Sequence, residues 1–189
     1  MTKDEAIRIL DELKNSPNMK NHGLAVGFTM AALYDYLKGK DQTPELSKED
    51  WEVVGILHDA DYEITNKSLE LHTEETTKKL KELATDQQII DAIRGHCDKE
   101  TRSTLMAKSV YAADELTGLI VACALVRPDK KLSSVSKESV MKKFKDKYFA
   151  AGANRDQIKT CETELEIPLE EFISMTLKAM QDNADELGL

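Results

Sequence analysis

Hydrophobic residues along this chain recur mostly three or four positions apart, which is the period of an amphipathic α-helix. The pattern predicts helices at about 2–14, 20–38, 47–58, 72–83, 86–96, 104–126, 136–145 and 168–187. No stretch alternates apolar and polar residues with the period that is expected of a strand. The sequence therefore predicts an all-α fold.

Several predicted helices begin at residues that commonly cap a helix. Thr2 with Glu5 has the pattern of a capping box, and Ser47 with Asp50 can cap the third helix. Pro168 is favoured in the first turn of the last helix. A looser stretch that includes residues 150–154 follows the helix at 136–145. These signals place the boundaries of the predicted helices.

The length of the chain, 189 residues, is close to the usual size of one compact domain. No internal repeat, long linker or low-complexity segment divides it. We therefore expect a single helical bundle over residues 1–189. We expect its metal-site residues between about 20 and 120, and its final helix at about 168–187.

Composition and charge exclude several classes of protein. A net charge of −9 argues against wrapping a long nucleic acid, which requires a basic surface. The longest nearly apolar run, Leu116 to Val126, is too short to span a bilayer, and Met1 to Leu10 lacks the features of a secretory signal. Three widely spaced cysteines fit reduced thiols. We expect a cytoplasmic protein that binds no membrane and is a monomer or a homodimer.

One segment differs in charge from the rest of the chain. Residues 127–155 contain nine basic and three acidic residues, a net charge of +6 within an acidic protein. The segment would suit a flap over an anionic substrate, with Arg127, Lys130 and Arg155 as the preferred phosphate contacts. The alternative interpretation is a solvated face that binds nothing.

Residues that can bind metal lie on the apolar faces of the predicted helices. His22, His58 and His96 each have apolar residues at helical spacing, so all three are expected to point inward. Asp59 follows His58 directly, and Asp114 lies in the middle of the most apolar helix. A buried carboxylate needs a cationic partner. A metal ion held by these imidazoles and carboxylates would supply that charge.

The order of these residues resembles the defining pattern of the HD-domain metal-dependent phosphohydrolases. The matching positions are His22, the dipeptide His58-Asp59 after an apolar helix, and Asp114. The resemblance covers over half of the chain. It implies a helical fold of the HD type in which these four residues bind one metal ion.

Two further histidines extend the resemblance to the binuclear members, which include the HD-type diadenosine tetraphosphate hydrolases. His72 and His96 resemble their two extra ligands, which implies a second metal ion with Asp59 as the bridge. Polar residues share the predicted helix face of His72, so the alternative is that it simply starts an exposed helix.

The resemblance implies one or two divalent transition-metal ions, namely Mn, Fe, Co, Ni or Zn. Such ions polarise a phosphoryl group and make hydroxide available at neutral pH. The implied reaction is hydrolysis of a phosphoester or phosphoanhydride in a small anionic phosphorylated metabolite, with a nucleotide as the preferred substrate. The same ligands also occur in HD-type di-iron oxygenases, and a non-catalytic module that binds metal and nucleotide for signalling is a further alternative.

The sequence departs from the family pattern after the His-Asp pair. Some binuclear members have a lysine there to contact phosphate, whereas this chain has Asp61 and Glu63 at nearby positions. With Asp59, these residues are the candidate catalytic carboxylates. Asp61 and Glu63 would either donate a proton to the leaving group or orient the histidine ligands, and the second interpretation is preferred.

Overall fold

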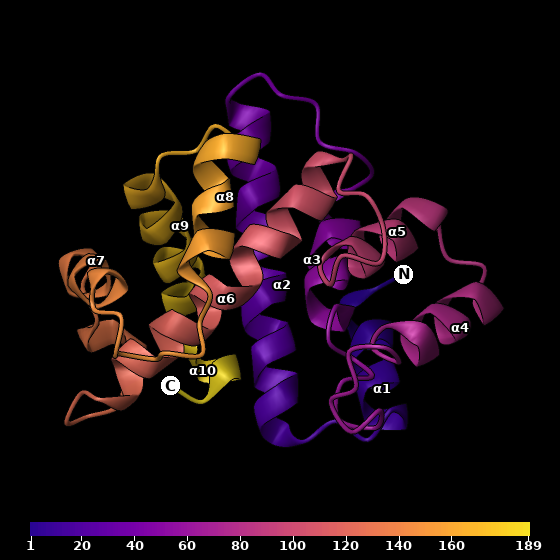
Figure 1. Cartoon of the computed structure of the whole chain (residues 1–189), viewed down its shortest axis with the longest axis horizontal. Helices are drawn as coiled ribbons and strands as arrows, with labels where there is room; N and C mark the ends of the chain where they lie inside the picture. Colours follow the sequence, from indigo (N-terminus) through magenta and orange to yellow (C-terminus); the bar gives the residue numbers. More distant parts are fainter.

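A computed structural model describes all residues, 1–189, and contains helices but no strands, which confirms the all-α prediction (Figure 1). The elements are α1 (Lys3–Glu12), α2 (Pro17–Gly39), α3 (Lys48–Leu57), α4 (Glu74–Glu82), α5 (Gln87–Gly95), α6 (Leu105–Leu125), the 3-10 turn η1 (Leu132–Ser134), α7 (Lys137–Lys145), α8 (Arg155–Glu164), α9 (Leu169–Asp182) and α10 (Ala184–Leu187). None of these helices combines the length and the apolar character that crossing a membrane requires.

The predicted capping residues act as expected at α1 and α3. Thr2 and Glu5 form a capping box, and Ser47 forms one with Asp50. Helix α2 begins earlier than predicted because the Ser16 side chain accepts a hydrogen bond from the backbone of the first turn, and Pro17 occupies the first helical position.

The structure differs from the prediction at three further places. Helix α4 starts at Glu74 and not near His72, because Thr73 has a φ of 67°, which interrupts a right-handed helix. Helix α8 was not predicted, since it buries only two residues, and its start depends on a cap from Asn154. The last predicted helix is interrupted at Asn183, which separates α9 from α10.

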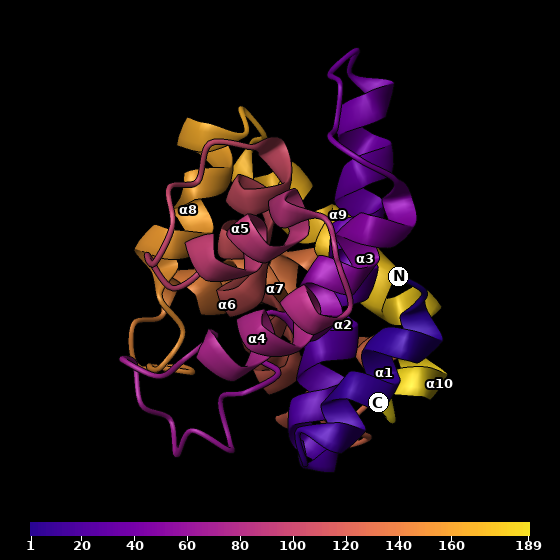
Figure 2. The same cartoon turned by 90° about the vertical axis from the view of Figure 1, so that its right-hand side faces the viewer.

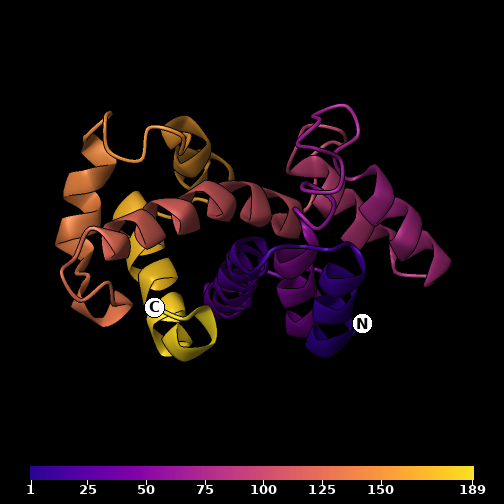
Figure 3. The same ribbon diagram turned by 90° about the horizontal axis from the view of Figure 1, so that it is seen from below.

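The two longest helices, α2 and α6, organise the molecule. Helix α6 crosses α2 and runs through the whole structure, with α7 and α9 at one end and α4 and α5 at the other (Figures 1 and 3). Trp51 is completely buried beneath this framework and donates a hydrogen bond from Nε1 to the Glu45 carbonyl at 2.7 Å. The crossing of α2 and α6 brings residues from distant parts of the sequence together.

Helices α2 and α3 pack unusually closely through glycines. A Cβ atom at Gly55 would lie 2.6 Å from the Cα atom of Gly27, and one at Gly23 would lie 2.6 Å from the carbonyl oxygen of Ile56. Real Cβ atoms do not approach backbone at such distances. The close approach places the ring of His22, from α2, 5.0 Å from the ring of His58 at the end of α3.

Candidate metal centre

Four predicted ligands from three helices form a compact group. Ligand atoms of His22, His58, Asp59 and Asp114 all lie within 4.8 Å of one another. Asp114 Oδ1 lies 3.1 Å from Nε2 of His22 and 3.4 Å from Nε2 of His58. Both of these nitrogens are 3.7 Å from Asp59 Oδ2. The group contains the nitrogen and oxygen donors that transition metals prefer.

The second carboxylate oxygen of Asp59 faces the two remaining histidines. Asp59 Oδ1 lies 3.1 Å from Nε2 of His72 and 3.3 Å from Nε2 of His96. The two Nε2 atoms are 3.0 Å apart. Asp59 therefore lies between two sets of donors, one at each of its oxygens.

Backbone carbonyls fix the orientation of two of the imidazoles. Nδ1 of His58 contacts the Gly55 carbonyl at 2.8 Å, and Nδ1 of His96 contacts the Ile93 carbonyl. A carbonyl oxygen only accepts, so Nδ1 is the donor in each pair. In the neutral imidazole, Nε2 then has a free lone pair that points toward Asp59.

The residues fit a bound metal because one buried nitrogen of the group has no other partner. Nε2 of His58 is buried and forms no hydrogen bond, although carboxylate oxygens surround it. A buried polar atom without a partner is unfavourable, and a metal ion would satisfy this nitrogen and both carboxylates together.

The same contacts shift the pKa values of the metal-free protein. Burial alone would lower the pKa of His58, but the carboxylates of Asp59 and Asp114 raise it to about 9. Burial alone would raise the pKa of Asp114, whereas His22 and His58 lower it well below its ordinary value. Without metal, protons on the imidazoles therefore balance the charge of the carboxylates.

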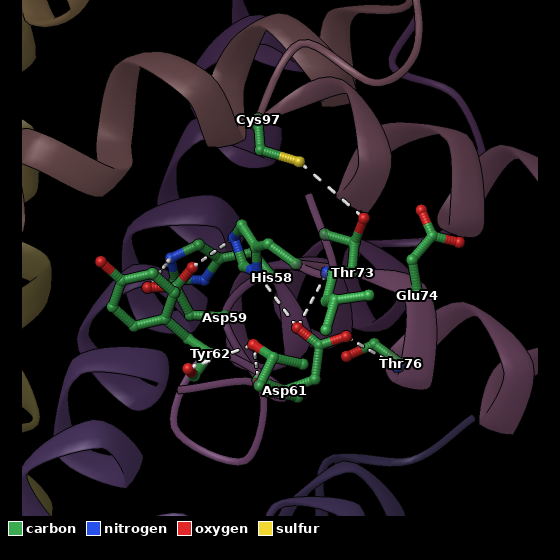
Figure 4. Close-up of polar contacts among 12 residues, drawn as sticks. His58, Asp59, Asp61, Tyr62, Thr73, Glu74, Thr76 and Cys97 are labelled. Carbon is green, nitrogen blue, oxygen red and sulfur yellow. Dashed lines mark hydrogen bonds and ion pairs between the residues drawn. The ribbon is translucent and has the colours of Figure 1, made fainter. Parts of the chain in front are cut away.

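Asp61 is completely buried and contacts His72 directly. Its Oδ1 accepts from the Thr73 backbone N–H at 2.8 Å (Figure 4). The same oxygen lies 3.0 Å from His72 Nδ1. Its Oδ2 accepts from the Thr76 backbone N–H at 3.0 Å. Burial would raise the pKa of Asp61, but His72 and these N–H groups lower it overall. The Asp61 carboxylate thus orients the imidazole and caps α4, which favours the interpretation that it positions a histidine ligand.

Glu63 lies in a different environment. Its Oε2 accepts a hydrogen bond from the Ser16 backbone N–H at 2.6 Å, so this carboxylate holds the start of α2 against the segment that follows the His-Asp pair. Glu63 belongs to neither group of residues with metal-ligand spacing.

Solvent reaches the centre from one side. The side chains of His22, Asp114 and Asp59 are 25%, 19% and 18% exposed, whereas those of His58, His72 and His96 are 0%, 4% and 4% exposed. His22 also lines a cleft of about 470 Å³ between α2, α6 and residues 187–189. The centre is therefore open to solvent on the side of His22 and Asp114.

The structure does not bring the three predicted phosphate contacts together. The Arg155 guanidinium donates to backbone carbonyls of the 146–153 loop, including those of Ala150 and Ala153 at 2.6 Å. Arg127 and Lys130 are exposed beyond the end of α6. That end lies roughly 16 Å along the helix axis from Asp114. Arg155 is thus engaged in shaping its own loop.

The loop that Arg155 organises does lie near the centre. The backbone N–H of Asn154 donates to Glu115 Oε2 at 3.1 Å, one residue after Asp114. This loop and the segment that follows His58 are on the same face of the molecule and on the same side of α6, toward different ends of that helix (Figures 2 and 3).

Sequence reasoning missed two contributors near the second set of donors. Cys97 lies close enough to His72 and His96 to offer a third donor, although its thiol donates to the Arg94 carbonyl and burial raises its pKa. Lys99 donates to the His72 carbonyl at 2.6 Å and so holds the segment that carries this histidine. Only the adjacency of Cys97 to His96 could have indicated the first.

Comparison with known families matches residues 19–119 to the model described as HD domain. This range is more than half of the chain and contains both sets of donors around Asp59. No curated protein and no solved structure matches the chain.

Proposed function

Because the chain belongs to the HD-domain family, whose members are mostly metal-dependent hydrolases, we propose that it hydrolyses a phosphoester or phosphoanhydride of a small phosphorylated metabolite. The observation that carries the proposal is the position of Asp59 between two sets of imidazoles. One carboxylate with a separate donor set at each oxygen suits a pair of divalent ions.

In this proposal His22, His58, Asp59 and Asp114 hold one ion, and Asp59, His72 and His96 hold a second. Bound divalent ions supply polarisation of the phosphoryl group and hydroxide at neutral pH. Mn, Fe, Co, Ni and Zn suit the imidazole-rich donors better than Mg.

The residues of the chain itself orient the centre and control access to it. The Gly55 and Ile93 carbonyls hold the imidazoles of His58 and His96, and Asp61 holds that of His72. Burial of these three histidines excludes water from behind the centre. Because His22 and Asp114 are partly exposed, the substrate can reach the centre from their side.

The preferred substrate class is a nucleotide. Its phosphate would meet the metal centre, while the cleft beside His22 is large enough to receive an organic group, since ligand pockets typically have volumes of about 300–1,000 Å³.

The experiment compares metal content and phosphate release in the wild type, Asp59→Ala and Asp35→Ala. Chelated protein is reloaded with each candidate metal and assayed on nucleotides and sugar phosphates. Asp59→Ala should lose bound metal and turnover, because it removes donors from both sets. Asp35→Ala removes an exposed carboxylate that pairs with Lys48 on the surface, and both properties should stay at wild-type values.

The outcomes separate the rival functions. Wild-type protein that never binds metal, or an Asp59→Ala variant with normal metal-dependent turnover, would contradict the proposal. Oxygen uptake by the iron form without phosphate release would instead indicate the di-iron oxygenase alternative. Tight nucleotide binding without turnover across the metals would indicate a signalling module.

A further inference from the structure

A continuous surface leads from the metal centre into the cleft beside His22. On α6, Gly118 and Val121 follow Asp114 by four and seven positions, so they lie on the same helix face. On α2, Asn18 and Ala25 flank His22 at helical spacing. Leu187, Gly188 and Leu189 complete the lining of the cleft. Figure 1 shows α10, which ends at Leu187, beside α2 and α6.

The α6 wall of the cleft is apolar and open. A Cβ atom at Gly118 would meet no other atom within 4 Å. Leu125 lines the same wall and is 50% exposed, although leucine side chains are usually buried. The wall is therefore suited to the face of an apolar group.

The α2 wall is polar without being charged. The Asn21 side chain donates to the Leu187 carbonyl at 3.1 Å, whereas the exposed Asn18 amide forms no hydrogen bond within the protein. No lysine or arginine lines the cleft. Lys130 and Lys131 belong to an adjoining pocket that shares only Gly188 and Leu189 with the cleft. A charged group placed against Gly118 and Val121 would therefore have no cationic partner on the walls formed by α2 and α6, and these walls favour an uncharged group.

We infer that the cleft binds the uncharged organic group of a nucleoside monophosphate, with the base or sugar against Gly118 and Val121 and a polar edge at Asn18. The inference rests on the proposed phosphohydrolase function. Water adds to phosphorus, the bond from phosphorus to the nucleoside oxygen breaks and that oxygen takes up a proton. The products are a nucleoside and inorganic phosphate.

The test narrows the cleft with Gly118→Leu, a change that fills open space and favours the helix. The variant should reduce kcat/KM for nucleoside monophosphates relative to that for methyl phosphate by about tenfold or more. Asn18→Ala should raise KM for the nucleotide about fivefold with little change in kcat. Gly39→Leu is the matched control, because a side chain at Gly39, at the far end of α2, also meets nothing within 4 Å.

Binding measurements separate this inference from the proposed function. Titration of metal-loaded protein with uncharged nucleosides should show binding to wild type and Gly39→Leu but not to Gly118→Leu, with circular dichroism verifying the fold of each. Binding of this kind without turnover would keep the inference and remove the hydrolase. An unchanged kcat/KM ratio in Gly118→Leu, or faster hydrolysis of ribose 5-phosphate or nucleoside triphosphates than of monophosphates, would overturn the inference.

Discussion

Asp61 connects His72 of the proposed metal centre with the start of α4, although it lies 11 residues before His72 in the sequence. One of its oxygens contacts His72, and both accept backbone N–H groups at the start of α4, where the Thr73 side chain provides no cap. The carboxylate thus fixes the helix start and the imidazole together. Both contacts use acceptor capacity, which only the ionised carboxylate supplies at two oxygens.

Asp61→Asn should weaken the second set of donors specifically. The amide replaces one acceptor by a donor, so either a backbone N–H of α4 or His72 loses its partner. We expect a loss of about 1–3 kcal/mol in the free energy of unfolding. We also expect metal affinity at His72 and His96 to fall by about 10–100-fold. Calorimetric titration with Mn²⁺ would measure both the affinity and the number of ions bound.

Asp50→Asn is the matched control, because Asp50 also caps a helix with its carboxylate but contacts no histidine. It should lower stability by at most about 1 kcal/mol and leave the number of bound ions unchanged. Equal loss of metal in both variants would assign the effect of Asp61→Asn to general instability.

For individual residues, the sequence predicted which histidine side chains point inward, but it did not predict every hydrogen-bond partner of the other candidate residues. The inward positions of His22, His58 and His96 follow from helical periodicity, which a single sequence displays directly. The partners of Glu63 and Arg155 are backbone groups fixed only by tertiary structure. Charge and position in the sequence could not reveal those hydrogen bonds.

The contact of α2 with α3 sets the separation of two proposed ligands. Gly27 and Gly55 allow the helix backbones to touch, and His22 and His58 each lie within five residues of this contact. A change of a single methyl group in this contact should therefore move the imidazoles apart.

Gly55→Ala is expected to force α2 and α3 apart, since its methyl group would lie 2.6 Å from the backbone of Gly27. We expect a loss of about 1–3 kcal/mol in the free energy of unfolding. If the protein is a phosphohydrolase, displacement of the ligands by about 1 Å should lower kcat by on the order of 100-fold. Thermal unfolding and the phosphate-release assay would measure the two effects.

Gly118→Ala adds the same methyl group to a helix where nothing lies within 4 Å. It should raise stability by about 0.5–1 kcal/mol, because alanine favours a helix more than glycine does. Comparable destabilisation of both variants would show that the glycine contact has no special role.

At the element scale, local signals predicted helices well where capping and a long apolar stripe coincide. Helices α3 and α6 have both features, and their predicted bounds are close to those observed. Helix α8 has the same length as α3 but buries only Ile158 and Cys161, and it is held by tertiary contacts, including one from Gln157 Nε2 to the Tyr111 carbonyl at 2.9 Å. Such a contact has no counterpart in local sequence, so the helix was missed.

Across the whole molecule, the metal-free state depends on protons that a metal would displace. The pKa of His72 would be lowered by burial, but Asp59 and Asp61 raise it to about 9, the value also reached by His58. Because the pKa of each histidine is higher in the folded protein than the unfolded value of about 6.5, its protonation stabilises the folded state. This contribution is complete at pH values below about 6.5. That contribution disappears as pH rises through about 9.

Metal binding should show the opposite dependence on pH, because a histidine ligand must be neutral. For each imidazole that must lose its proton, the apparent metal affinity rises by up to about tenfold with each pH unit, as long as the pH is below the pKa of that imidazole. The difference in Tm between Mn²⁺-loaded and chelated protein should therefore widen from pH 6.5 to pH 9. Scanning fluorimetry across this pH range would measure the difference in Tm. Ionisable groups that titrate equally in the metal-loaded and chelated forms do not contribute to this difference. A constant or narrowing difference would mean that metal does not displace protons from His58 and His72, and the proposed ligand set would then be wrong.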